Sequence, residues 1–339
     1  MKRLLSIALS VAIMLMGLST ALAKEEIIEA EGTYVMDSRL DETAASATAR
    51  AREEAKRSAV ERAGVYVESY SEVVEFRLSK DEVRTIAAQM LQVLDEKSSI
   101  AVLQDNLLEF TVHIKALVDV SDTDKLQALM SNKQQLDAMT TQNVELQAKY
   151  DELKKQMEEL KREYNSAGDA QKVEIKKAAA LNDARFKAAQ ELDQGNGCYN
   201  RGDYYSALAA YTRSLALEPD YVNALNNRAN TYAALGQYPN AMTDLQKALE
   251  LNPNSAEAHN NLGSVYVSMN RFDEALKEYS EALRLKSDYA DAYINRGWVY
   301  YRQEKYAEAL SDAQKAAALN PNDPSTRDLI NRANTKLGR

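Results

Sequence analysis

The sequence predicts an α+β amino-terminal domain, a coiled-coil helix and then an all-α solenoid of four helical repeats with a cap helix. Three observations lead to this fold class. Residues 110–118 alternate strictly between apolar and polar side chains, as in a half-buried strand. Large apolar residues recur in heptads between residues 129 and 164. Beyond residue 185 the same residue types return about every 34 residues, the period of a helix-turn-helix solenoid.

The composition restricts the classes of function. The chain has 339 residues, more than a single hydrophobic core serves, and its formal net charge is −9. A nucleic-acid-binding protein is expected to show basic clusters, so this acidic chain is predicted to have no nucleic-acid partner. The hydrophobic fraction of 45% and charged fraction of 27% are ordinary for a soluble globular protein.

Residues 1–23 are predicted to be a signal peptide. Lys2 and Arg3 precede an apolar run from Leu4 to Leu18, and Ala21-Leu22-Ala23 supplies a cleavage site before Lys24. A retained anchor is the alternative, but the run is short for a spanning helix. We therefore expect export, to a bacterial periplasm, with no membrane insertion after cleavage. Cys198 is the only cysteine and lies far from the cleavage site, so neither a lipoprotein nor an internal disulfide is expected.

Residues 24–121 are predicted to form a small α+β domain of order β-α-β-α-β-β. Strands are expected at Ile27–Met36, at Val65–Leu78 and over the alternating residues 110–118, where Phe110, Val112, Ile114, Ala116 and Val118 share one face. Beta-branched and aromatic side chains are the reason for the first two assignments.

Two helices are expected between these strands. The first runs from about Asp41 to Ala63 and ends at Gly64, and its apolar stripe is alanine, so it can lie close on a sheet; the stripe comprises Ala44, Ala51, Ala55, Ala59 and Ala63. Ser79 to Glu82 form a capping box that opens the second helix.

The stretches "AREEAKRSAVERAGVYVES" and "FTVHIKALVDV" resemble the amino-terminal domain of flagellar assembly protein T and related envelope proteins. The resemblance covers about 95 residues. It implies a small periplasmic domain used for contacts during assembly, without a catalytic site.

Residues 122–166 are predicted to form a coiled coil. The a positions are Leu129, Leu136, Asn143, Tyr150, Met157 and Tyr164, and the d positions include Met139, Leu146, Leu153 and Leu160. Asn143 at an a position favours a parallel two-stranded register, and hence a homodimer. The alternative is a single amphipathic helix packed against the repeats, because Asn132 interrupts the d series. A connecting helix is expected at residues 167–184.

Residues 185–323 contain the repeats. Each unit places alanine or glycine where its two helices approach closely, an aromatic residue before the second helix, and alanine three positions later. A proline closes the unit because it cannot continue the helix. The recurring positions are Gly195, Ala229, Gly263 and Gly297; Tyr204, Tyr238, Phe272 and Tyr306; Ala207, Ala241, Ala275 and Ala309; and Pro219, Pro253 and Pro321, with Ser287 in place of the third proline.

This segment resembles four tandem tetratricopeptide repeats (TPR), and residues 324–339 resemble the solvating cap helix of that family. The motifs are "ALNNRANTYAALGQYPNAMTDLQKALELNP" and "AHNNLGSVYVSMNRFDEALKEYSEALRL". The sequence departs from the pattern at Ser287, at Cys198, where tyrosine recurs later, and at Ala313, where the fourth repeat lacks its aromatic residue.

The resemblance implies a concave groove, lined by the first helix of each repeat, that binds a protein or peptide partner. The residues expected to line it are Asn223, Asn226, Asn227, Asn230, Glu257, Asn260, Asn261, Asp291, Asn295, Trp298, Tyr301 and Arg302. Asparagine can donate and accept, which suits a peptide backbone. Two alternatives stand beside this assignment. Asn227, Asn261 and Asn295 can instead bond the backbone of the neighbouring repeat, and Trp298 can pack under the cap helix around Leu329 and Ile330.

Some members of the family grip a C-terminal carboxylate with Lys and Arg. Those positions fall at Leu192, Glu257 and Asn261 in one frame and at Asn226, Asp291 and Asn295 in the next. None is basic, so we expect a neutral or basic partner rather than one held by a carboxylate clamp.

The sequence shows no catalytic constellation. His113 and His259 have no partner at metal-ligand spacing, and no glycine-rich phosphate loop is present. We therefore predict no metal, no cofactor and no enzymatic activity. The predicted function is an exported scaffold that helps assemble or organise an envelope complex. The alternative is a structural component of an envelope or motility apparatus, docked through the amino-terminal domain and the coiled coil.

Overall fold

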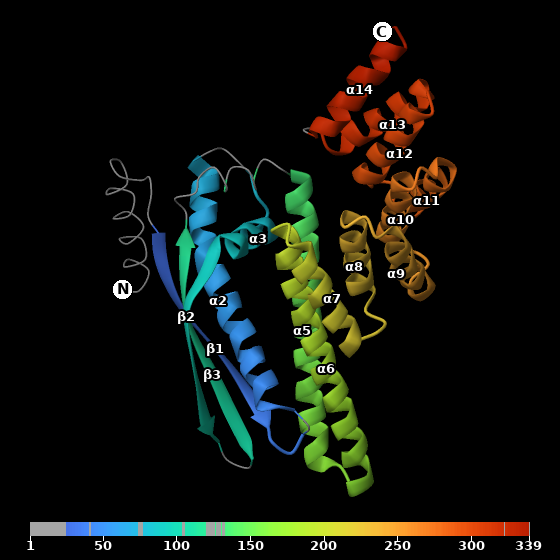
Figure 1. Cartoon of the computed structure of the whole chain (residues 1–339). Coiled ribbons are helices and arrows are strands. Elements are labelled where there is room, and N and C mark those ends of the chain that lie inside the picture. The colour runs from blue at the N-terminus through green and yellow to red at the C-terminus, as the bar shows by residue number, and fades with distance from the viewer. Residues whose placement is uncertain are drawn as a thin grey trace. The chain divides into compact units, whose positions relative to one another are not determined.

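Figure 1 shows the computed structural model, which describes residues 25–40, 42–73, 77–103, 106–119, 126, 130, 133–321 and 323–338. The chain divides into two compact units, residues 1–145 and residues 146–339. The predicted signal peptide lies outside the described residues. Of the helices in these ranges, none combines the length and the apolar character needed to span a bilayer.

The first unit contains a three-stranded antiparallel sheet in the order β1-β3-β2. Its strands are β1 (Glu25–Asp37), β2 (Leu91–Val102) and β3 (Leu107–Asp119). The predicted alternation in β3 is confirmed, because Phe110, Val112, Ile114, Ala116 and Val118 are all buried. Every second residue of a strand faces the same side, so this sheet has one covered face and one exposed face.

Helix α2 (Ala44–Val73) lies along the covered face of the sheet. The predicted alanine stripe is largely right: Ala51, Ala55, Ala59 and Ala63 have no exposed surface, although Ala47 replaces Ala44 at its start. Gly32 of β1 explains the close approach. A Cβ atom there would lie 2.2 Å from the Ala51 carbonyl oxygen and 2.2 Å from the Ala55 nitrogen.

The predicted strand at Val65–Leu78 is wrong, because α2 continues through Gly64 to Val73. Val67 and Ser71 extend the buried stripe by two further helical turns, with 0% and 4% of their surface exposed. Contact with the sheet therefore overrides the strand propensity of this segment. In the described residues the order of elements is β-α-α-β-β, not β-α-β-α-β-β.

Helix α3 (Lys80–Met90) begins with the predicted capping box. The Glu82 nitrogen donates to Ser79 Oγ at 3.2 Å, and the Ser79 nitrogen donates to Glu82 Oε2 at 2.6 Å. The chain passes from α3 directly into β2, since Leu91 is both the cap of the helix and the first residue of the strand.

Helix α5 (Lys133–Ser166) contributes its first half to the amino-terminal unit. Leu136 belongs to the core beneath the sheet, together with Leu126 and Met130. The polar a position has a partner inside the chain, because Asn143 Nδ2 donates to Thr85 Oγ1 of α3 at 3.4 Å.

The second half of α5 packs against α6 (Asp169–Asn200) in the carboxy-terminal unit. Asn182 Nδ2 donates to the Leu153 carbonyl at 3.0 Å, and the rings of Tyr150 and Phe186 lie 5.3 Å apart. The heptad residues Leu146, Tyr150, Leu153 and Met157 are buried. These contacts favour the alternative of an amphipathic helix packed within the chain. The predicted connecting helix is continuous with the first repeat, since α6 has no break near residue 184.

The remaining helices alternate as first and second helices of the repeats, with α6 supplying the first helix of repeat one. They are α7 (Tyr204–Leu217), α8 (Val222–Ala234), α9 (Tyr238–Leu251), α10 (Ala256–Ser268), α11 (Phe272–Leu285), α12 (Ala290–Arg302), α13 (Tyr306–Leu319) and the cap helix α14 (Pro324–Lys336). The second helices α7, α9, α11 and α13 end at equivalent leucines. Helix α11 ends with the same backbone geometry although Ser287 replaces proline, so the proline is not needed for termination.

Glycine lets the two helices of a repeat touch. A Cβ atom at Gly195 would lie 2.4 Å from the Tyr211 ring, and one at Gly263 would lie 2.7 Å from the Tyr279 ring. The fourth repeat has Ala313 in place of that tyrosine, and the cap helix takes over its role. Leu329 of α14 comes within 2.9 Å of a Cβ atom built on Gly297. Leu329 of α14 therefore packs where the missing aromatic ring of the fourth repeat would lie.

Candidate peptide-binding face

The predicted groove residues lie on α8, α10 and α12, and we call them the first-helix face. They differ in exposure. Asn226, Asn227 and Asn260 are buried, with 3%, 9% and 7% of their surface exposed. Glu257 and Arg302 are exposed, and the others are half-buried: Asn223, Asn230, Asn261, Asp291, Asn295, Trp298 and Tyr301. The face therefore offers a ligand fewer asparagines than the sequence suggests.

Asparagines join neighbouring first helices by side-chain hydrogen bonds. Asn227 Nδ2 of α8 donates to Asn196 Oδ1 of α6 at 2.7 Å. Asn295 Nδ2 of α12 donates to Asn260 Oδ1 of α10 at 3.1 Å. The predicted bonds of Asn227 and Asn295 to the neighbouring repeat are therefore wrong in their acceptor, which is a side chain and not the backbone, and the predicted bond of Asn261 is not found, since its Nδ2 has no partner in the structure. The amides of Asn227 and Asn295 hold the repeats in register, so only part of their hydrogen-bonding capacity remains for a ligand.

The junction between α8 and α10 lacks this bond. Asn226 and Asn261 occupy the positions that Asn260 and Asn295 hold one repeat later. Asn226 Oδ1 and Asn261 Nδ2 are nevertheless both buried without a hydrogen-bond partner. An unsatisfied buried polar group costs about 1–3 kcal/mol, so this junction is less stable than the next one.

The middle of the face is acidic. Burial raises the pKa of Asp291 above its ordinary value, and the charge of Asp323 raises it further. Burial also raises the pKa of Tyr289, with added contributions from Glu257 and Asp291. Burial is the largest cause of both shifts. The carboxylates of Glu257, Asp291 and Asp323 add to them, and Lys286 acts in the opposite direction on the pKa of Asp291.

The carboxy-terminal end of the face is covered by the cap helix. Trp298 Nε1 donates to Ser325 Oγ at 3.0 Å, and its indole packs against a cluster that contains Leu329 of α14, as Ile330 also does. The half-buried indole therefore supports α14, as the alternative assignment expects. Tyr301 packs between Trp298 and Tyr306, with ring centroids 5.8 and 5.3 Å away.

Arg302, the last residue of α12, points towards the preceding repeat. Its guanidinium lies 5.9 Å from the centre of the Phe272 ring, at the start of α11. This exposed side chain therefore has an aromatic partner within the solenoid.

Two arginines that the sequence reading missed bind the repeats together. Arg228 makes a two-point ion pair with Asp244 at 2.7 and 2.8 Å, and its Nη1 donates to Thr212 Oγ1 of the preceding repeat at 3.5 Å. Arg296 repeats this arrangement two units later, with Asp312 at 2.7 and 2.9 Å and Ser280 Oγ at 3.0 Å. The signal lay in the sequence, since the arginine and the aspartate recur at twice the repeat length, with serine in place of threonine at the third position.

The third repeat has a different pair at the interface of its two helices. His259 Nδ1 lies 2.7 Å from Glu278 Oε2, and its Nε2 lies 3.3 Å from the Pro253 carbonyl oxygen. His259 therefore lies between the two helices of the third repeat. Its partners are those of a structural histidine.

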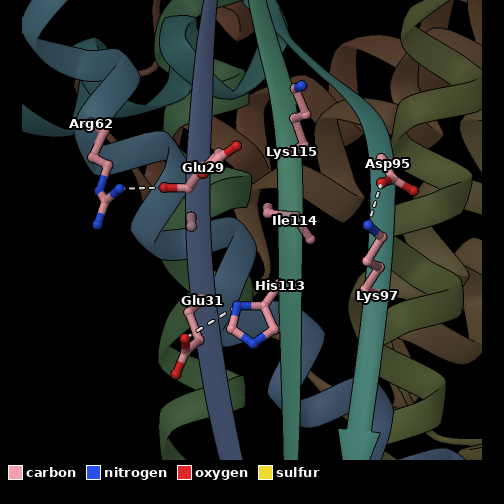
Figure 2. A pocket seen from close by; sticks show the side chains of 9 residues that line it. Glu29, Glu31, Arg62, Asp95, Lys97, His113, Ile114 and Lys115 are labelled. Atoms are coloured by element: carbon pink, nitrogen blue, oxygen red, sulfur yellow. Dashed lines mark hydrogen bonds and ion pairs between the residues drawn. The ribbon is translucent and has the colours of Figure 1, made fainter.

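The exposed face of the amino-terminal sheet carries a shallow hollow lined by charged side chains (Figure 2). One row across the strands contains Glu31, His113 and Lys97, and His113 Nδ1 lies 3.2 Å from Glu31 Oε2. The next row contains Glu29, Lys115 and Asp95. Arg62 also lines the hollow, and the opposite charges balance, so the hollow has no net charge to select an ion. Across the described ranges, no group of three or more His, Cys, Asp or Glu residues is placed to hold a metal.

Family comparisons agree with the geometry of the second unit. Residues 195–236, 229–269 and 263–304 match the family model described as TPR repeat, and residues 290–323 match the one described as Tetratricopeptide repeat. The matched residues, 195–323, are a run of tetratricopeptide repeats. This fold is a scaffold for protein–protein interaction. No curated protein matches the chain.

Solved structures similar to the chain are repeat proteins. The crystal structure of MamA protein is 28% identical, with a TM-score of 0.39, covering 45% of this chain and 83% of that one. A thermophilic TPR protein of Thermus thermophilus is 24% identical, with a TM-score of 0.42 and coverage of 45% and 84%. The first TPR domain of the human RPAP3 protein is 24% identical, with a TM-score of 0.34 and coverage of 35% and 94%.

Proposed function

We propose that the chain is an exported, non-catalytic scaffold that binds a protein or peptide on its first-helix face and helps organise a complex in a bacterial envelope. Stacked tetratricopeptide repeats present an extended surface of this kind. The observation that carries the proposal is the polar surface that Asn223 and Asn230 give to α8, together with the carboxylates of Glu257 on α10 and Asp291 on α12. Export rests on the signal-peptide pattern of residues 1–23.

The partner is a neutral or basic segment. Glu257 and Asp291 occupy positions where a carboxylate clamp carries cations, and both carboxylates add to the rise that burial causes in the pKa of Tyr289. A C-terminal carboxylate would meet repulsion there, whereas a lysine or arginine side chain would be attracted. The half-buried Asn223 and Asn230 supply amides beside this acidic site.

A matched pair of charge reversals tests the binding face. Glu257 lies exposed on the first helix α10, and Glu250 lies exposed on the second helix α9. Glu257→Lys is expected to weaken retention of partners from envelope extract by roughly tenfold or more, while Glu250→Lys leaves retention unchanged. Equal retention by both variants, with both folded, would contradict the proposed face.

A second candidate function uses the amino-terminal unit. Its resemblance to the domain of flagellar assembly protein T supports a role in assembly contacts, and it is a compact unit with its own core. In this reading the chain is a structural component of an envelope or motility apparatus. Retention of the same partners after charge reversal at Glu257, combined with loss after replacement of residues in the amino-terminal unit, would favour it.

The predicted coiled-coil homodimer receives less support than the packed helix. Leu146, Leu153 and Met157 are already buried, and Asn182 of the same chain holds the α5 backbone at Leu153. We infer that α5 is an internal support. Leu153→Asp is then expected to lower stability equally at low and high protein concentration. If the destabilisation depends on protein concentration, the coiled-coil dimer is supported instead.

A further inference from the structure

The edge strand β2 exposes an unusual amount of apolar surface for a solvated strand. Its large apolar side chains, with those of the residue that follows the strand, are exposed to 40% at Val93, 49% at Leu94, 58% at Ile100, 80% at Val102 and 39% at Leu103. Three of them, Ile100, Val102 and Leu103, gather at the carboxy-terminal end of the strand, and an exposed apolar group of this kind marks an interaction surface.

The register explains why these side chains are uncovered. Ile100 pairs with Phe110 of β3, and Val102 pairs with Leu108. Paired residues of antiparallel strands face the same side, so Ile100 points to the side of the sheet on which Phe110 is buried. Helix α2 lies over β1 and β3 and makes few contacts with β2. The apolar end of β2 therefore extends beyond its cover.

The two edges of the sheet are protected differently. At the β1 edge, Arg62 of α2 donates to the Glu29 carbonyl oxygen, and β1 carries carboxylates at Glu25, Glu26, Glu29 and Glu31. The charges of β2 are confined to Asp95, Glu96 and Lys97, and residues 98–102, of sequence Ser-Ser-Ile-Ala-Val, carry none. An uncharged edge segment with β-branched residues can pair with another strand.

We propose that residues 98–102 of β2 pair in antiparallel fashion with the same residues of a second copy of this chain. The charge pattern selects the register. Registers centred on Glu96 or Lys97 place like charges opposite each other, and those centred on Ser98 or Ser99 place Glu96 opposite Ile100 or Val102. A register centred on Ile100 places no like charges opposite each other within residues 98–102, and it does not place Glu96 opposite Ile100 or Val102.

In this register Ile100 faces Ile100 of the other copy, and Ser98 faces Val102 across the two-fold axis. The pairing makes one continuous sheet of the two three-stranded sheets and places the exposed side chains of Ile100 and Val102 beside side chains of the other copy. A second copy fits better than a charged partner because the segment has no charge to attract one. The interface is short, so the dimer is weak and depends on concentration.

Sedimentation of the full-length protein over a concentration series tests the pairing. We expect a reversible dimer that Ile100→Lys abolishes and Val173→Lys leaves intact; Val173 is a matched control on α6, with 52% exposure against 58% for Ile100. Ile100→Lys is expected to keep its melting temperature, since the side chain is exposed. A monomeric wild type overturns the proposal, as does a dimer that persists in folded Ile100→Lys. Ile27→Lys changes the β1 edge. If Ile27→Lys abolishes the dimer and Ile100→Lys does not, the proposal is overturned.

Cysteine cross-linking tests the register. Opposed residues in an antiparallel pair have Cβ atoms about 4.5–5.5 Å apart, close to the separation that a disulfide spans. Ile100→Cys should form an intermolecular disulfide on mild oxidation, whereas Val173→Cys should not. The natural Cys198 is buried. Cross-linking of Ile100→Cys no faster than that of Val173→Cys refutes the pairing.

Discussion

Gly32→Ala tests the contact that organises the amino-terminal unit. The added Cβ atom would lie 2.2 Å from backbone atoms of both Ala51 and Ala55, against 3.4 Å or more in ordinary contact. Because these are backbone atoms, no side-chain rotation relieves the overlap. Helix α2 must move about 1 Å off the sheet, and a gap of that size forfeits up to half of each local dispersion contact.

The expected loss is about 3 kcal/mol, at the upper end for overpacking, because the alanine stripe moves as one surface. For a unit of this size the melting temperature should fall by roughly 10 °C. Thermal unfolding followed by circular dichroism measures the change. A melting temperature within ~2 °C of wild type would refute the reasoning.

Gly64→Ala is the matched control in the same unit. Gly64 lies inside α2, and a Cβ atom there would lie 3.3 Å from the Val83 side chain. Alanine is favoured over glycine inside a helix by about 1 kcal/mol, so this variant should be neutral or more stable. If α2 instead ended at Gly64 in a left-handed conformation, as the sequence suggests, the same change would destabilise the unit.

Three further predictions concern the repeats. Arg228→Met should cost about 3 kcal/mol in chemical denaturation because the buried Asp244 carboxylate loses its two-point partner, and a change below ~1 kcal/mol would contradict this. Folding raises the pKa of Asp291, so the native chain binds more protons between the unfolded and folded pKa values and loses stability as pH rises through that window. The stability of Asp291→Asn relative to wild type should therefore increase towards neutral pH. If the difference in unfolding free energy between the two proteins decreases instead, the pKa of Asp291 is not raised. Trp298→Ala should lower the free energy of unfolding by ~2 kcal/mol, which is less than for a fully buried indole, and should loosen the contact with α14, whereas Trp298→Phe should retain most of the stability. A near-normal melting temperature for Trp298→Ala would instead favour a ligand-binding role for the indole.

The candidate face was only partly predictable from sequence. The repeat period placed Asn227 and Asn295 at equivalent positions of two first helices, but the period cannot say which atom accepts their hydrogen bonds. The acceptors, Asn196 and Asn260, come from other helices, so the choice appears only once the repeats are stacked. The same holds for Trp298, whose polar neighbours in sequence suggested a ligand contact while Ser325 lies 3.0 Å away in space.

The sequence by itself determined what is periodic or local in this protein. The repeats follow from a 34-residue period that needs no knowledge of distant contacts. The capping box at Ser79 follows from hydrogen bonds that close within one helical turn. The alternation in β3 follows from the geometry of a strand.

Only the tertiary structure decided the elements whose local preferences conflict with their surroundings. Residues 65–73 favour a strand by composition, yet the buried positions Val67 and Ser71 continue the stripe of α2 because the helix gains more by covering the sheet. The heptads of α5 are compatible with a partner helix from a second copy or from the same chain. In the structure they pack against α6 of the same chain. Burial depends on contacts between residues that are far apart in the chain, so it cannot be derived from a short stretch of sequence.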